Sequence, residues 1–398
     1  MSQKDRDPLF RCYIHTCRTI CCAYLEGRQP FGPTPSFHRR LKGEMERMKK
    51  SFVCFLFVIF SFLCNGCELR AYHADENEHH DKNPLTVMKW NVSAPNWTHA
   101  SLVGNELFIA VNADQTNRAS VNELLAVNVK TKKQRMLFQS AHEEAMVQWV
   151  QANNRWVVWE DSTSFGAEST IWVMDRKTGS TFLAARSNSS PPTVFNPVLD
   201  GEYIAWTEKG SQFGQVKLFH LPTKQGKTIG RLVSQGLYNE FVSLRNGKVI
   251  WTDSHDGKGY YYVYDIRTGR SASYESPAPF PAYAEYDNGL IYAIHLEDLE
   301  YPDQQTFGYF DLKTKRFSRF PVSHGIIQYF DVSNGKLAFL DDRGAVSVYE
   351  QRNGKWKAVK VSLDRYPRLL YFDQQDHLIV EQEDTKRDRR WLNIVKWP

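Results

Sequence analysis

From Leu85 onward, apolar and polar residues alternate with a period of two in short runs, and clusters of turn residues separate these runs. The runs are rich in β-branched and aromatic residues, which is typical of short, half-buried β-strands. No stretch of this region has a helical period of useful length. Residues 85–398 are therefore predicted to form an all-β domain.

Two sequence elements recur along this region. One has the form apolar–x–apolar–Asp–x–Lys/Arg–Thr–Gly, as in "TIWVMDRKTG" from Thr170. The threonines of its copies are 47, 45, 45 and 46 residues apart, at Thr131, Thr178, Thr223, Thr268 and Thr314. The other element is a turn followed by an apolar strand, as in "NGKVIWTD", and it has seven copies.

A unit of about 45 residues with four short strands is typical of a β-propeller blade. We assign an inner strand A, a strand B with the "NGKVIWT" element, a strand C with the "YVYDIRTG" element and an outer strand D. In the second blade these strands are expected at Met146–Gln151, Arg155–Glu160, Thr170–Asp175 and Ser180–Ala185. Asn-Gly and Asp-Gly pairs then occupy A–B hairpins and Thr-Gly pairs occupy C–D hairpins, where positive φ is required.

The two ends of the domain complement each other. The seventh copy ends at strand C, "WLNIVKW", whereas an orphan strand, Leu85–Val92, precedes the first strand A. The orphan strand is predicted to complete blade seven and close the ring, which removes exposed strand edges. The prediction is a seven-bladed β-propeller of four-stranded antiparallel blades. Six blades is the alternative, because the interval into the sixth blade is irregular.

The repeats "LDGEYIAWTEKG" and "NGKLAFLDDRGAVSVYE" resemble the TolB-like propeller repeats of bacterial envelope proteins. Similar repeats occur in the propeller domains of prolyl-oligopeptidase-type peptidases. The resemblance extends over residues 85–398, although the Ser-Pro-Asp-Gly turn of those repeats is missing from every blade. It implies a propeller fold and export, and it does not specify a partner.

A short apolar segment precedes the domain. Lys49 and Lys50 are followed by the uncharged run Ser51–Cys64, and Gly66 lies directly before Cys67. The run is shorter than the roughly 20 residues that a membrane-spanning helix needs, and it suits a signal peptide. Its end resembles the bacterial lipoprotein signal, in which a cysteine becomes the lipidated first residue. We expect a signal peptide at 48–66, then lipidated Cys67 and a polar spacer over 67–84. An ordinary signal peptide and a signal anchor are the alternatives.

Residues 1–47 do not fit this scheme, because a targeting signal acts from the start of the nascent chain. "KGE" at 42–44 can be encoded by a purine run that resembles a bacterial ribosome-binding site. We therefore expect translation to start at Met45 or Met48 and residues 1–47 to be a spurious extension. The cysteines in that segment lack the C-x₂-C spacing of structural zinc sites.

Charge and cysteine content differ between the leader and the domain. Residues 1–67 hold 11 of the 50 basic and 5 of the 45 acidic side chains, so the rest of the chain is nearly neutral. No nucleic-acid partner is therefore expected. All 7 cysteines lie at or before Cys67. The exported domain must therefore be stabilised by packing without disulfides.

Catalytic motifs are missing from the sequence. It contains no G-x-S-x-G, no H-E-x-x-H and no phosphate-binding G-x-x-x-x-G-K-[ST]. A peptidase would also need a separate hydrolase domain, and no sequence remains for one. A binding module is favoured over an enzyme, with no catalytic residue assigned.

Acidic residues end strand B in most blades, and they are the candidates for a ligand-binding face. Since B–C and D–A loops open on the same face, these acids are expected around one mouth of the central channel, where they would attract cations or basic segments. The candidates are Asp161, Glu208, Asp253, Asp298 and Asp342. Hydrogen bonding to turn amides is the commoner role of such acids and is favoured here.

Four histidines are expected on the same face: His99, His142, His295 and His324. Imidazoles brought together near the axis could hold a divalent metal. The resemblance adds that some TolB-like propellers acting as pectate-type lyases use a histidine-rich metal site. Because the sequence fixes no geometry, separate histidines and no cofactor are favoured.

Tryptophans recur at one blade position, at Trp159, Trp206 and Trp251. Packing between blades is favoured there over stacking on a sugar ring. Taken together, these features predict a lipid-anchored, extracytoplasmic β-propeller at a bacterial envelope, with the membrane and a protein, peptide or glycan as partners. A metal-dependent polysaccharide lyase or hydrolase is the alternative function.

Overall fold

The computed structural model describes residues 85–92, 97–113, 120–163, 167–187, 195–320, 326–363, 367–384 and 389–397. All of them belong to one unit of the chain, Asn83–Pro398. Residues 1–47, the expected signal peptide, Cys67 and the spacer lie outside the described residues. No helix in the described part of the chain is both long and apolar enough to cross a membrane.

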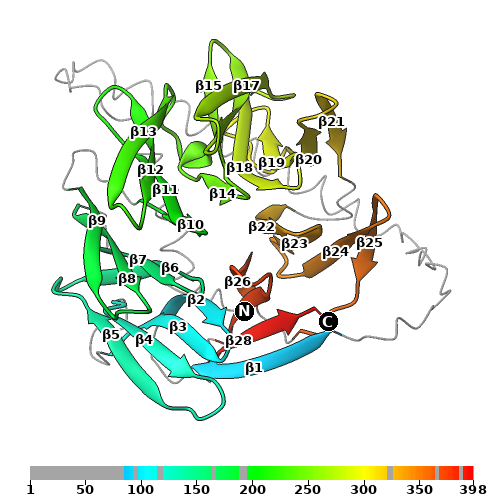
Figure 1. Ribbon diagram of the computed structural model, residues 1–398. Coiled ribbons are helices and arrows are strands. Elements are labelled where there is room, and N and C mark those ends of the chain that lie inside the picture. The colour runs from blue at the N-terminus through cyan, green and yellow to red at the C-terminus, as the bar shows by residue number, and fades with distance from the viewer. Residues whose placement is uncertain are drawn as a thin grey trace, which may run out of the picture. The chain divides into compact units, whose positions relative to one another are not determined.

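This unit is a ring of seven sheets, each with four antiparallel strands (Figure 1). The prediction of a seven-bladed propeller is therefore confirmed, and the six-bladed alternative is wrong. In the second blade, the observed strands overlap the four expected ranges. A single turn of 3-10 helix, η1 (Leu237–Asn239), interrupts the strands before the fourth blade.

The blades share one order of strands, from the ring axis outward. The inner strands A of blades one to seven are β2 (Trp97–Val103), β6 (Ala145–Ala152), β10 (Val198–Asp200), β14 (Ser243–Arg245), β18 (Phe280–Asp287), β22 (Ile327–Ser333) and β26 (Pro367–Phe372). The strands B are β3 (Glu106–Val111), β7 (Trp156–Thr163), β11 (Tyr203–Glu208), β15 (Lys248–His255), β19 (Leu290–Leu296), β23 (Lys336–Asp341) and β27 (Leu378–Asp384). The strands C are β4 (Glu123–Asn128), β8 (Ser169–Asp175), β12 (Gly214–His220), β16 (Lys258–Asp265), β20 (Gln305–Asp311), β24 (Val346–Arg352) and β28 (Arg389–Lys396). The outer strands D are β5 (Gln134–Gln139), β9 (Thr181–Ser187), β13 (Gln225–Leu232), β17 (Arg270–Glu275), β21 (Arg316–Arg319), β25 (Lys355–Val359) and β1 (Thr86–Val92).

The N-terminal strand closes the ring, as predicted. β1 pairs with β28 in antiparallel register from Thr86↔Lys396 to Val92↔Arg390. Blade seven is thus completed by the first strand of the domain, and Figure 1 places the C-terminal end beside the beginning of β1. β28 has a partner on each side and does not present a free edge.

The turn residues take the conformations that their sequence pattern predicts. Asn288 and Gly289, between β18 and β19, have φ angles of 48° and 85°, the combination that a two-residue hairpin turn requires. In the C–D turn of blade two, Asp175 Oδ1 accepts a hydrogen bond from Lys177 N (2.8 Å), and Gly179 has φ 75°. The repeated Asp and Gly of the Asp–x–Lys/Arg–Thr–Gly element are therefore turn-forming residues.

The core lies between the blades. Each junction between neighbouring blades holds its own cluster of buried apolar side chains, including the junction of blades seven and one, where Leu107 packs with Leu392 and Ile394. Trp159, Trp206 and Trp251 are at most 5% exposed and belong to such clusters. The prediction that these tryptophans pack between blades is confirmed.

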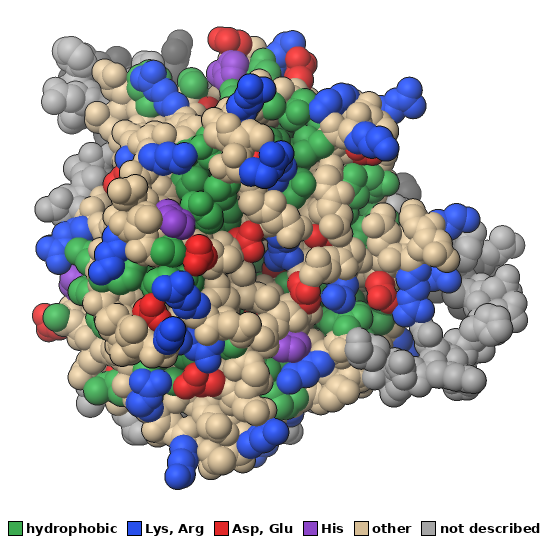
Figure 2. Space-filling model, in the orientation of Figure 1, with side chains coloured by type: hydrophobic (Ala, Val, Ile, Leu, Met, Phe, Trp, Pro, Cys, Tyr) green, Lys and Arg blue, Asp and Glu red, His purple; other side chains and the backbone are tan. Residues whose placement is uncertain are grey.

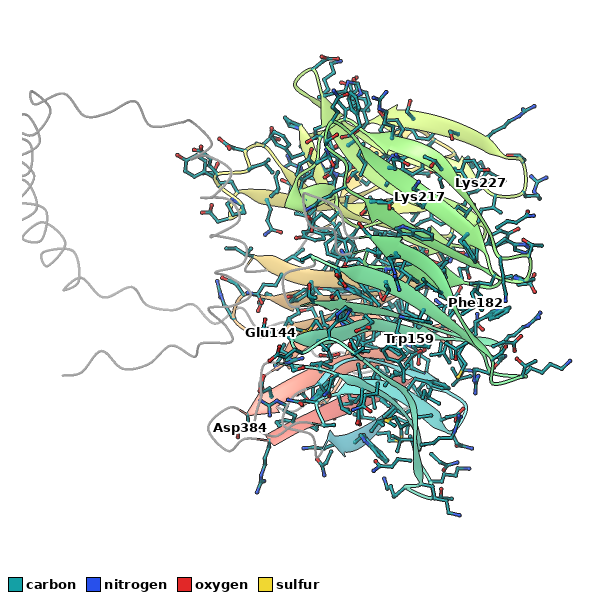
Figure 3. The ribbon with its side chains drawn as sticks, turned by 90° about the vertical axis from the view of Figure 1, so that its left-hand side faces the viewer. Glu144, Trp159, Phe182, Lys217, Lys227 and Asp384 are labelled. Carbon is teal, nitrogen blue, oxygen red and sulfur yellow. The ribbon has the colours of Figure 1, made fainter. Side chains whose placement is uncertain are left out.

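The strand order gives the ring two different faces. D–A and B–C connections open on one face, which we call the loop face, and A–B and C–D turns lie on the other, which we call the turn face. Figure 3 views the ring from the side. Glu144 and Asp384 mark the loop face at its left, and Phe182 and Lys227 lie toward the turn face.

Candidate functional site

The acids predicted at the ends of strands B lie on the loop face, and their partners differ. Asp253 is buried and accepts hydrogen bonds from Val233 N (2.6 Å) and Ser234 N (2.9 Å) in the preceding D–A connection. Asp342 accepts one from Ile326 N (3.0 Å) in the same kind of connection. In blades four and six, these carboxylates therefore hold D–A connections against strand B.

The other three acids have more local partners. Glu208 forms an ion pair with Lys217 on the adjacent strand (3.3 Å), and Asp298 accepts a hydrogen bond from Glu300 N (2.8 Å). Asp161 is buried 3.8 Å from His142, and burial raises the pKa of its carboxyl. Each of the five predicted acids thus interacts within its own part of the loop face.

Glu160, next to Asp161, is a further buried carboxylate that binds backbone amides. Its oxygens accept hydrogen bonds from Phe195 N (3.0 Å) and Asn196 N (3.2 Å), just before the inner strand of blade three. Burial raises the pKa of Glu160 to about 7, although these two amide donors favour the charged form. This side chain joins blade two to blade three at the loop face.

The predicted histidines have different surroundings. His295 is buried, where its Nδ1 donates to Thr306 O (3.2 Å) and its Nε2 accepts from the Tyr261 hydroxyl, and burial lowers its pKa to about 4. His142 lies beside Asp161, His99 lies on β2, and His324 is outside the described residues. Among the residues that the structure describes, no three or more His, Cys, Asp or Glu side chains are grouped to hold a metal ion.

A row of aromatic rings on and beside the inner strands is the feature that the sequence-based prediction missed. Neighbouring ring centroids are 5.9, 4.3, 5.6 and 5.1 Å apart along Tyr371, His99, Trp149, Phe241 and Tyr283. We call these five residues the aromatic row. They come from blades seven, one, two, four and five, so the row runs round the ring axis. His99 and Tyr283 lie in the loop-face half of their strands, and Tyr371 lies nearer the turn-face end of β26.

Bulges in the inner strands place three members of this row. The strand pairing shifts register at His99, Trp149 and Tyr283, where φ is 37°, 53° and 51°. Positive φ is uncommon for residues other than glycine, and β-bulges redirect side chains. A signal for the row was present in the sequence: His99, Phe241 and Tyr283 each lie five positions before the first residue of an A–B turn.

Nearer the turn face, the inner strands carry two interacting carboxyl groups, Glu285 on β18 and Asp331 on β22. We call them the carboxyl pair. Burial and the neighbouring Asp331 raise the pKa of Glu285 to about 8, while Ser243 and Arg245 oppose this shift. Burial also raises the pKa of Asp331 to about 6, against the favourable effect of Arg245. At neutral pH, Glu285 therefore holds a proton and Asp331 carries most of the charge.

Glu285 departs from a pattern that links neighbouring inner strands. In this pattern, a side chain of one blade accepts an N–H from strand A of the next: Ala152 N donates to Ser101 (3.1 Å), and Phe372 N donates to Asp331 (2.6 Å). The amide that would serve Glu285 is Val332 N, which instead donates to Asp331 (2.6 Å). Glu285 therefore does not accept the hydrogen bond from Val332 N of the next inner strand, although its carboxyl interacts with Ser243.

At the turn face, the A–B turn of blade seven forms hydrogen bonds with both neighbouring blades and with blade three. Gln374 Nε2 donates to Leu199 O of blade three (2.5 Å), and Gln375 Oε1 accepts from Gly104 N of blade one (3.1 Å). Asp376 accepts hydrogen bonds from Ser333 and Asn334 of blade six. Polar bonds therefore tie this end of the ring together, whereas the loop-face end presents aromatic rings, and Tyr283 there is 40% exposed.

Comparison with known proteins supports the fold. No protein-family model matches the chain, and no curated protein sequence matches it. The β-propeller domain of the Trilobed protease from Pyrococcus furiosus is similar in structure, with a TM-score of 0.54 and 13% identity over 75% of this chain and 94% of that one. The computationally designed Ika8 protein gives a TM-score of 0.50 and 13% identity over 76% and 84%. TolB from Acinetobacter baumannii gives a TM-score of 0.41 and 12% identity over 71% and 61%. At these identities, the matches with the first two proteins show a shared propeller fold alone.

Proposed function

We propose that this chain is an exported binding module that holds a protein or peptide segment at the loop face. The observation that carries the proposal is the aromatic row beside the carboxyl pair. Aromatic faces attract cationic side chains as well as apolar ones, and a nearby carboxylate strengthens that preference. The preferred ligand is therefore a polypeptide segment with a Lys or Arg side chain directed toward Asp331 and Glu285.

The rigidity of the ring supports this role. The loop face is formed by seven blades that share interblade cores, so bound segments would meet a preformed surface that changes little. Val233, Leu299 and Tyr301 are exposed apolar side chains in loop-face connections, at 49%, 45% and 52%. They extend the apolar character of this face beyond the aromatic row and favour a macromolecular partner.

The test is a binding screen with the chain that begins at Glu68, which contains every described residue. Synthetic peptides with one Lys or Arg are compared with the same peptides carrying norleucine, and with neutral and acidic oligosaccharides. We expect retention of the basic peptides, and loss of that retention in the Trp149→Ala variant. Retention of oligosaccharides alone would contradict a polypeptide ligand. Cleavage of an acidic oligosaccharide would support the lyase alternative.

We further propose that the protein is tethered to the outer surface of a bacterial membrane by acyl chains on Cys67. The sequence "FLCNGC" at the end of a short apolar run supports this anchor. Intact mass of the protein extracted from membranes of its host tests it. We expect a chain that begins at a diacylated Cys67 and lacks residues 1–66. A mass that retains residues 1–47, or an unmodified Cys67, would contradict the anchor.

A further inference from the structure

The C–D turns give the turn face a basic rim. These turns and the first residues of strands D carry two or three basic side chains in each of six blades, and all but Arg176 are exposed. They are Lys130, Lys132, Lys133, Arg176, Lys177, Lys224, Lys227, Arg267, Arg270, Lys313, Lys315, Arg316, Arg352 and Lys355. We call this set the basic rim. Figure 2 looks onto this face and shows Lys and Arg side chains distributed over it.

The acids of the same turns bind the backbone, and two of them also pair with basic side chains, Asp175 with Arg155 (3.6 Å) and Asp265 with Lys248. Asp175, Asp265 and Asp311 accept hydrogen bonds from amides of their own turns, with distances of 2.7 to 2.8 Å. They are half-buried, whereas Lys177, Arg267 and Lys313, each two positions after one of these acids, are exposed. The repeated Asp–x–Lys/Arg–Thr pattern therefore builds each turn with its carboxylate and leaves its cation facing outward.

A groove of about 520 Å³ opens beside the rim between blades one and two. Its lining includes Arg135, Arg155, Arg176 and Lys177, and one carboxylate, Glu106. Glu106 is shared by Arg176 (3.0 Å) and Arg135 (3.6 Å), so it cannot fully neutralise both. Guanidinium groups present paired donors that suit phosphate oxygens.

Two of these arginines are held in place by neighbouring groups. Arg176 lies over the Phe108 ring (5.0 Å), and its Nη1 donates to Asn153 O (2.6 Å). Arg155 lies over Trp156 (4.7 Å) and forms an ion pair with Glu202 (3.3 Å). The groove therefore presents its cations with little conformational freedom left to lose, which favours an anionic ligand.

The chain enters the ring on this same face. β1 begins at Thr86, opposite Lys396 at the turn-face end of β28, and runs toward the loop face. Cys67 precedes Leu85 by only 18 residues, a segment that spans at most about 60 Å when fully extended. A lipid on Cys67 would thus keep the turn face within reach of the membrane surface.

From these observations we propose that the turn face docks on an anionic phospholipid bilayer. The basic rim lies against the headgroups, and the groove takes a headgroup phosphate. Lys and Arg side chains near an anionic membrane surface are each attracted to it. This orientation leaves the aromatic row pointing away from the membrane. The docking surface itself rests on the described residues, and only the tether rests on the proposed lipidation of Cys67.

The experiment is sedimentation of the chain beginning at Glu68 with vesicles, so that no acyl chain or leader contributes. All seven interblade clusters lie within this chain, which therefore contains the complete ring. We expect binding to vesicles with 30% phosphatidylglycerol in phosphatidylcholine, no binding to pure phosphatidylcholine, and release by about 0.5 M salt. Replacing Lys130, Lys133, Lys177, Arg267 and Lys313 by Gln is expected to weaken binding at least tenfold.

The matched control removes the same charge from the loop-face ends of the strands. It replaces Arg186, Arg319, Arg343, Lys360 and Arg389 by Gln, and all five are exposed. Equal weakening by both variants, or binding to neutral vesicles, overturns the proposal. Binding to heparin without binding to vesicles also overturns it and assigns the face to a polyanionic polymer. The native protein could carry a lipid on Cys67 while the unlipidated chain does not bind anionic vesicles. That result would support the proposed anchor and contradict the proposed docking surface.

Discussion

The ring centroids of Trp149 and Phe241 are 5.6 Å apart, although Trp149 lies on the inner strand of blade two and Phe241 lies just before that of blade four. The inner strand of blade three, β10, has only 3 residues. Aromatic rings from the neighbouring blades two and four contact each other beside it. This contact joins Tyr371 and His99 on one side to Tyr283 on the other. It makes the aromatic row continuous over five of the seven blades.

The first prediction concerns this row. Replacing Tyr283 by Ala removes a 40% exposed ring and is expected to weaken binding of basic peptides about fivefold, since one cation–aromatic contact is worth about 1 kcal/mol. The free energy of unfolding should fall by about 1 kcal/mol, because the partly exposed ring loses its contact with Phe241 (5.1 Å). Calorimetric titration and urea unfolding measure the two quantities.

Met136 supplies the control for this measurement. It is 54% exposed on the outer strand β5, far from the inner strands in the order of the sheet. Met136→Ala should leave peptide affinity unchanged. Similar losses in both variants would mean that the peptides bind nonspecifically to exposed apolar side chains.

The second prediction tests closure of the ring. A chain that begins at residue 93 lacks β1 and leaves one edge of β28 unpaired. Met88 and Trp90 also pack against the core between blades seven and one, and Val87 packs against the core between six and seven. We expect the free energy of unfolding to fall by about 3 kcal/mol or more, and oligomers to form through the free edge.

A chain that begins at Leu85 is the control for this truncation. It removes the spacer and keeps β1, so it should unfold at the same urea concentration as the chain from Glu68. Size-exclusion chromatography of the two shortened chains reports the oligomers. If the chain from residue 93 stays monomeric and equally stable, β1 does not close the ring in solution.

The repeat determined how much of this fold was predictable. Asn-Gly turns, Asp–x–Lys–Thr turns and alternating strands are local signals, and the missing strand D of blade seven had one available substitute, Leu85–Val92. The site was harder to predict because it depends on irregularities. Bulges at His99, Trp149 and Tyr283 redirect side chains. The alternation of apolar and polar residues along a strand does not predict where such bulges occur.

Carboxylates show the same difference between local and long-range information. The sequence located acids at the ends of strands B, but which amides they bind depends on the paths of the D–A connections. Glu285 was not selected at all. Its unusual environment arises from Asp331, Ser243 and Arg245 on the neighbouring inner strands, and these lie 40 or more residues away in sequence.

The third prediction concerns Glu160. Replacing it by Ala leaves the amides of Phe195 and Asn196 without their acceptors in a buried site. An unsatisfied buried donor costs about 1 to 3 kcal/mol, so we expect the free energy of unfolding to fall by about 3 kcal/mol. Glu143, an exposed acid on the same face, gives the matched variant Glu143→Ala, which should unfold like the original chain. Equal stability of the two variants would show that these two hydrogen bonds do not anchor the connection.

The last prediction is a dependence on pH that Glu285 creates. Its pKa is raised to about 8 in the folded chain, from an ordinary value of 4.5. The folded state therefore binds a proton that the unfolded state has lost between these values, and stability falls as the pH rises through this range. This contribution is complete below pH 4.5 and is lost above about pH 8. Glu285→Gln mimics the protonated carboxyl, so its contribution does not change with pH. Between pH 6 and 9, the original chain should lose about 2.7 kcal/mol more of its unfolding free energy than Glu285→Gln does. Glu160 titrates in both proteins and cancels from the difference.

Urea unfolding at pH 6, 7, 8 and 9 measures this difference in unfolding free energy. Glu297→Gln is the control variant, because it removes an exposed carboxyl from the loop after β19. Parallel curves for the original chain and Glu285→Gln would mean that Glu285 is already ionised at pH 6. The carboxyl pair would then carry two charges at neutral pH, and the loop face would favour a doubly charged basic segment.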